Sequence, residues 1–163
     1  MKDRTLAPGR LCILIAVSVW CVPSRHVLAQ SAAASASPRW AVPPVLPPGA
    51  RIAIYRGDPT GPCQSTLLVA MPDGYRLPPH FHPSAEHVEV RQGTLLVGMG
   101  DVLDPARTRA PSAGDWATAP AGMHHYSIAR GRTVLAVTFT GPYTITYVHA
   151  EDAPRPRVFP AGY

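Results

Sequence analysis

Cysteine and lysine are almost absent from this sequence of 163 residues. The first scarcity bears on disulfide bonds and the second on phosphate binding. The cysteines are Cys12, Cys21 and Cys63, and the one lysine is Lys2. If the first 29 residues are removed on export, Cys63 stands alone and an intrachain disulfide is excluded. The remaining chain then also has no lysine with which to hold a phosphate group. Such a domain depends on packing or a metal for its stability.

Long apolar runs and sustained helical periodicity are missing as well. The run from Leu11 to Val22 is interrupted only by Ser18, yet it is shorter than the ~20 residues that a membrane-spanning helix needs. No segment keeps a helical period over three turns. The 20 prolines would break most helices but are tolerated at strand ends and edges. The sequence therefore favours an all-β domain without a membrane span.

The N-terminal 29 residues have the three parts of an export signal. A positive start, Lys2 to Arg10, precedes the apolar run, and small residues at 27–29 offer a cleavage site before Gln30. A retained membrane anchor is the alternative, and a lipoprotein is disfavoured because Trp20 stands where a small residue should precede Cys21. We expect an exported protein, periplasmic or secreted.

Charge gives no reason to expect a nucleic-acid partner. The formal net charge is +5, but four of the 15 basic residues and one of the ten acidic residues lie in 1–29. The net charge of the remainder is therefore only +2, without a basic stripe. We expect a small-molecule ligand or substrate instead.

The rest of the chain divides by composition into an arm, a domain and a tail. Residues 30–50 are rich in Ala, Ser and Pro and should form an extended arm that lies over the domain. Residues 51–150 form the predicted domain and 151–163 the tail. In the domain, short apolar runs broken by Gly, Pro and Asp at intervals of about ten residues are typical of a sandwich or barrel. The predicted strands are 51–56, 65–71, 80–82, 87–91, 94–99, 116–119, 124–128, 133–140 and 143–148, with one helical turn at 105–109.

Two histidines and a carboxylate have the spacing of metal ligands. His80 and His82 lie two residues apart, so a strand would present both imidazoles on one face, and Glu86 follows the turn after them. A later turn delivers His124 or His125, of which strand alternation allows only one to face inward. A lone histidine is usually structural, but a buried cluster of imidazoles without a metal would be costly to desolvate. We expect one divalent transition metal: Fe, Mn, Ni, Cu, Co or Zn.

These residues belong to a longer pattern that resembles the two motifs of the cupin superfamily. The matching positions are Gly74, His80, His82, Glu86, Gly93, Gly114, Pro120, Gly122 and His125. The resemblance implies a jelly-roll barrel, also called a double-stranded β-helix, with His80, His82, Glu86 and His125 as the metal ligands. One position departs, because cupins usually have Asn where this chain has Ala129. An amidohydrolase barrel, which also uses His-x-His, needs about 250 residues and is excluded by length.

The motif also predicts local geometry. Alternation after Glu86 should point Val88 and Val90 inward, and His87, Glu89 and Arg91 outward. Gly93 should then allow the chain to reverse in a tight hairpin.

The resemblance leaves two functions open. The first is a metal-dependent oxidoreductase of dioxygenase type, acting on a small apolar or aromatic molecule, with Glu86 as both ligand and catalytic base. The second is a binding or sensing module with a structural metal, favoured by the lack of an acid or base beyond the four ligands. Small exported bacterial cupins that end in a segment similar to 141–148 are the nearest resemblance, and cupins often form homodimers, so a homodimer is expected too.

Overall fold

The computed structural model describes residues 37–155. The predicted signal peptide, residues 30–36 of the arm and residues 156–163 of the tail lie outside this part. Within it, no helix is both long enough and apolar enough to cross a membrane.

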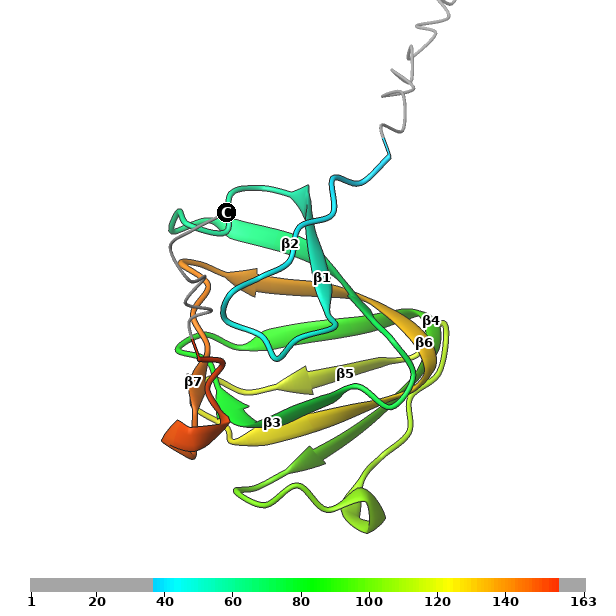
Figure 1. Cartoon of the computed structure of the whole chain (residues 1–163). Coiled ribbons are helices and arrows are strands. Elements are labelled where there is room, and N and C mark those ends of the chain that lie inside the picture. The colour runs from blue at the N-terminus through cyan, green and yellow to red at the C-terminus, as the bar shows by residue number, and fades with distance from the viewer. Residues whose placement is uncertain (1–36, 156–163) are drawn as a thin grey trace, which may run out of the picture. The chain divides into compact units, whose positions relative to one another are not determined.

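The described chain is built almost entirely of antiparallel strands (Figure 1), as predicted. The elements in chain order are β1 (Arg51–Arg56), β2 (Gln64–Met71), β3 (Arg76–Phe81), β4 (Glu86–Met99), η1 (Pro105–Arg107), β5 (Trp116–Ala119), β6 (His125–Thr140), β7 (Thr146–Tyr147) and η2 (Ala150–Asp152). The two η elements are single 3-10 turns, the first of them inside the segment predicted to make one helical turn.

Two long strands, β4 and β6, form the spine of the jelly roll. They pair along their whole length, from Glu86 opposite Phe139 to Met99 opposite His125. The second half of β6 also pairs with β2, and its first half with β3. The half of β4 that begins at Glu86 pairs with β5. Each long strand thus contributes to both layers of the barrel. The start of β4 and the start of β6 are therefore parts of one structure.

The predicted hairpin at Gly93 is wrong, because β4 continues through it. Gly93 has a positive φ of 76°, as a tight turn would need, but the strand stays paired with β6 and shifts register between Val90 and Gln92 and again between Gln92 and Thr94. The residue therefore forms a bulge that bends the strand rather than reversing it. Gly131, with φ 71°, occupies the corresponding bend of β6, where we predicted a gap between two strands.

Two other predicted strands differ in extent. β3 begins at Arg76 and ends before His82. Of the predicted strand 143–148 only Thr146 and Tyr147 pair with β3. In residues 143–145 the burial alternates as in a strand but there is no ladder; Tyr143 and Ile145 pack against the core.

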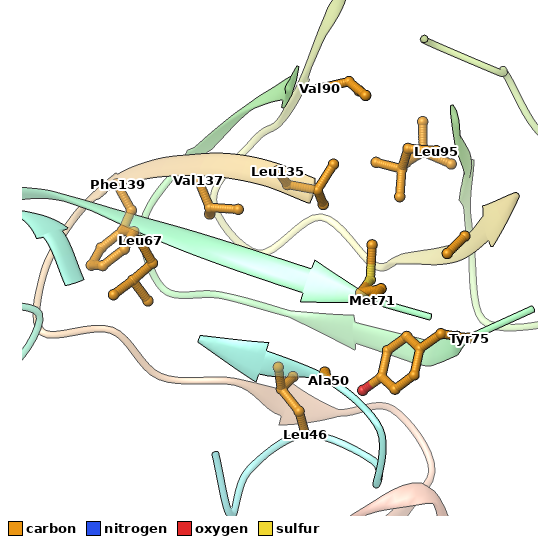
Figure 2. Close-up of a cluster of buried hydrophobic side chains, with 12 residues drawn as sticks. Leu46, Ala50, Leu67, Met71, Tyr75, Val90, Leu95, Leu135, Val137 and Phe139 are labelled. Atoms are coloured by element: carbon orange, nitrogen blue, oxygen red, sulfur yellow. The ribbon is translucent and has the colours of Figure 1, made fainter. Parts of the chain in front are cut away.

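The core lies between the layers and includes part of the arm (Figure 2). Its buried members come from the arm and from β2, β4, β6 and the turn before β3; they are Leu46, Ala50, Leu67, Met71, Tyr75, Val90, Leu95, Val97, Ala129, Leu135, Val137 and Phe139. Val88 packs against this cluster from the same face of β4 as Val90. His87 and Arg91 are exposed and the Glu89 side chain is 41% exposed, so the predicted alternation is confirmed. Leu46 of the arm is buried, and the Tyr75 hydroxyl donates to the Pro47 carbonyl at 2.9 Å. The described part of the arm thus covers one opening of the core.

Candidate metal centre

Three of the predicted ligands converge inside the barrel. One ring nitrogen from each of His80, His82 and His125 lies within 4.8 Å of the others. All three residues are buried: the exposed fraction is 2% for His80, 3% for His82 and 5% for His125. His80 is on β3, His82 follows it, and His125 opens β6 opposite His80 in the ladder. Antiparallel pairing of β3 with β6 is what brings together histidines 45 positions apart in the chain.

Each imidazole is oriented by a backbone carbonyl. A carbonyl oxygen can only accept, so the Nδ1 atom of each ring carries the proton and donates it. The three pairs are His80 to Pro78 at 2.7 Å, His82 to Thr144 at 2.6 Å and His125 to Met123 at 2.9 Å. The Nε2 atoms therefore keep their lone pairs for a common centre, which is the usual arrangement around metal-binding histidines.

Glu86 contributes its carboxylate to the same centre. Its Oε2 atom lies 3.5 Å from Nε2 of His82 and 3.5 Å from Nε2 of His125. Its Oε1 atom accepts a hydrogen bond of 3.1 Å from the Tyr143 hydroxyl. The side chain is buried at the start of β4. Its two oxygens have separate partners.

One atom shows that this donor set fits a metal ion. Nε2 of His82 is buried and has no hydrogen-bond partner among the described residues. A buried polar atom without a partner costs about 1–3 kcal/mol, and its lone pair points toward the other imidazoles and the carboxylate. An ion bound by the three histidines would satisfy this atom. Imidazole and carboxylate donors suit divalent transition metals.

The electrostatics keep the site in the state that metal binding requires. Burial, followed by repulsion from His125, lowers the pKa of His80 to about 3. Burial alone would raise the pKa of Glu86, but its close contacts with His125, His82 and His80 outweigh this effect and lower the pKa. At neutral pH, His80 is therefore neutral and Glu86 ionised, as ligands must be.

We expect the metal-free protein to lose stability in acid. The unfolded chain binds a proton at His80 near the ordinary value of 6.5, whereas the folded chain does so only near pKa 3. Between these values the unfolded state holds more protons, so the free energy of unfolding falls as pH drops from about 6.5 toward 3. The expected loss is about 1.4 kcal/mol for each pH unit in this range. Urea titrations of chelator-treated protein at pH 7.5 and 4.5 measure this. A His80→Gln variant should show a shallower dependence, and equal stability of the wild type at both pH values would contradict the burial of a neutral His80.

A mostly apolar cavity adjoins the centre. It has about 60 Å³ of space, enough for a few water molecules. Its polar lining consists of His80, Glu86, Thr118, His125, Ser127 and Tyr143. The remaining lining residues are apolar and come from the arm and from β2 to β6. Among residues 37–155, no Lys or Arg lines this cavity, so a ligand there would meet a hydrophobic wall and the metal site.

The other histidines considered from the sequence face away. The side chain of His124 is 38% exposed and bonds through Nδ1 to Asp101 at 2.6 Å. His87 is exposed and bonds to Thr118, and His149 contacts the backbone of Asp101. All three lie on the surface, as strand parity and position suggested.

The sequence predicted a strand at 143–148 but assigned this segment no part in the metal centre, which it contacts. Thr144 holds His82, Tyr143 holds Glu86 and stacks on His82 with ring centroids 4.9 Å apart, and Tyr147 pairs with His80 in the sheet. The signal for these contacts was weak. Two tyrosines in a short apolar segment are more often core residues than partners of a metal site.

The fold and the histidine cluster together define a cupin, and the comparisons with known proteins agree. Residues 57–144, more than half of the chain, match the family model described as "ChrR Cupin-like domain". The protein belongs to this family. The match includes both predicted motifs and Tyr143.

The individual proteins that resemble this chain match it over part of its length or at low identity. The chain is 44% identical over 61 residues to germin-like protein 5-1 of Oryza sativa subsp. japonica, but the match spans only 28% of that protein and 37% of this chain. It is 27% identical to a recombinant oxalate oxidase in complex with glycolate, with a TM-score of 0.51 over 66% of this chain and 59% of that one. An RmlC-like cupin from Shewanella frigidimarina superposes with a TM-score of 0.53 over 64% of this chain and 84% of that one; at 15% identity this likeness concerns the fold.

Proposed function

We propose that this protein is a metal-dependent oxidoreductase of dioxygenase type that acts on a small organic molecule. The observation that carries the proposal is the set of three buried imidazoles, each fixed at Nδ1, with Glu86 beside them and an apolar cavity in contact. His80, His82, Glu86 and His125 would hold the ion, which is Fe, Mn, Ni, Cu, Co or Zn. Likeness to an oxalate oxidase supports oxidative chemistry on a small substrate.

The chain's own residues would bind and orient the substrate. When bound, the metal would supply a Lewis acid and, if it is redox active, electron exchange with oxygen. The apolar walls would hold the body of the substrate and exclude water. Glu86, ionised in the barrel, would accept the proton of a substrate hydroxyl on its carboxylate. Because burial and the neighbouring carboxylate raise the pKa of Tyr143 well above its ordinary value, its phenol stays protonated and donates its proton to Oε1 of Glu86 in a hydrogen bond.

The cavity favours a neutral, apolar substrate such as a phenol or an enol. The oxalate oxidase was solved with glycolate, a small carboxylate. In the described part of this chain no guanidinium or ammonium group lines the cavity, so a second negative charge on a substrate would have no partner among those residues. Desolvating an unpaired charge is costly.

A non-catalytic binding or sensing module is the second candidate. The small size of the cavity, about 60 Å³, favours it, because a substrate and oxygen would both have to fit there. In that case the ion would stabilise the barrel or fix one ligand without turnover.

Elemental analysis and oxygen uptake test the proposal together. Protein purified without added metal should contain about one transition-metal ion per chain, and oxygen consumption should appear with at least one member of a panel of phenols and enols. A Glu86→Gln variant should lose this activity. Metal without oxygen uptake, together with tight ligand binding, would favour the second candidate, and the absence of metal would contradict both.

Export and a homodimer form part of the same proposal. The sequence of residues 1–29 supports cleavage near Gln30, and N-terminal sequencing of protein from the native host tests it. Light scattering of the purified domain tests the dimer.

A further inference from the structure

We propose that Tyr143 is a positioning residue that keeps Glu86 a one-oxygen ligand and thereby leaves coordination positions open toward the cavity. The inference rests on the proposed metal site. It concerns which residue keeps coordination positions of the ion open for a substrate.

The two carboxylate oxygens of Glu86 are already divided between two tasks. Oε1 accepts the hydrogen bond of the Tyr143 hydroxyl at 3.1 Å. Oε2 faces Nε2 of His82 and Nε2 of His125, each at 3.5 Å. An ion held by the histidines would therefore meet Oε2, while Oε1 is turned away to the phenol.

The phenol itself is held in place on two sides. Its ring stacks on His82 at a centroid distance of 4.9 Å and an interplanar angle of 26°. The same ring lies 4.4 Å from that of Phe139, and Phe139 is the residue paired with Glu86 in the β4–β6 ladder. Ring packing and strand pairing thus fix the donor and the acceptor relative to each other.

Without this hydroxyl, nothing in the described structure would hold Oε1 away from the ion. A carboxylate can bind a metal through one oxygen or through both. With both oxygens bound, Glu86 would occupy an additional coordination position. Tyr143, Glu86, His80 and His125 all line the cavity, so the position lost is one that an incoming ligand would use.

Tyr143→Phe isolates the hydroxyl because it keeps the ring stack on His82. Tyr147→Phe is the matched control: its phenol donates to the Val45 carbonyl at 2.8 Å, and its ring lies 6.3 Å from that of His80. Both variants lose one phenolic hydrogen bond near the centre, but only the first loses contact with Glu86.

The test uses Co²⁺ as the spectroscopic ion and azide as a small exogenous ligand. We expect Tyr143→Phe to bind Co²⁺ about 10-fold more weakly, the usual effect of losing a partner of a ligand, with an altered visible spectrum and at least several-fold weaker azide binding. Tyr147→Phe should match the wild type in all three.

A double-mutant cycle separates positioning from packing. In a Glu86→Gln background, the further change Tyr143→Phe should leave azide binding unaffected, since no second carboxylate oxygen remains to bind. If Tyr143→Phe alone keeps the wild-type spectrum and azide affinity, Tyr143 only packs and the inference is wrong. If the wild-type protein binds no Co²⁺, the metal site itself is wrong, an outcome that differs from the first.

Discussion

His125→Ala should empty the metal site, whereas His124→Ala should leave it occupied. The two residues are adjacent, but His125 is buried beside Glu86 and His124 bonds to Asp101 on the surface. Loss of an imidazole that contacts the ion should cost more than the 10–100-fold that removal of a ligand's outer partner costs. We therefore expect the affinity of His125→Ala to fall by more than about 100-fold.

The loss should also appear in stability. A metal present at 100 times its dissociation constant stabilises the folded state by about 2.7 kcal/mol, and this contribution disappears with the site. His80→Ala and His82→Ala should behave like His125→Ala, and all three should become insensitive to chelator. Elemental analysis and thermal melts with and without chelator measure these effects. If His124→Ala loses the metal while His125→Ala retains it, the ion lies elsewhere than in the barrel.

Gly93→Ala should be more damaging than Gly131→Ala, the matched control at the bend of β6. Both glycines have positive φ, 76° and 71°, a conformation that costs an L-residue about 1–2 kcal/mol. A Cβ on Gly93 would also lie 2.5 Å from the Arg132 carbonyl oxygen and 2.7 Å from Oγ1 of Thr133, whereas a Cβ on Gly131 would meet nothing within 4 Å. Overpacking adds about 1–3 kcal/mol, so only Gly93→Ala carries both costs.

Chemical denaturation of the two variants measures the difference directly. We expect Gly131→Ala to lose about 1–2 kcal/mol and Gly93→Ala clearly more, with lower metal occupancy because the bend joins the two halves of β4. Equal losses in both variants would show that β4 relaxes around the added methyl group and that the close approach does not matter.

The sequence was enough to predict the all-β class and which side chains of the two motifs share a strand face. His80 and His82 share a face because strand side chains alternate with a period of two, and Val88 and Val90 face inward from Glu86 for the same reason. Both inferences need only local geometry, so both could be made without coordinates. The all-β class followed likewise from turn residues and from the lack of a helical period.

Tertiary structure alone decided how the strands continue and what surrounds the centre. A glycine with positive φ permits both a hairpin and a bulge, and only pairing with β6 selects the bulge at Gly93. The contact of Tyr143 with Glu86 joins residues 57 positions apart, and no local pattern encodes it. The orphan Nε2 of His82 and the apolar cavity depend in the same way on packing between layers, because burial and distance are properties of the folded chain.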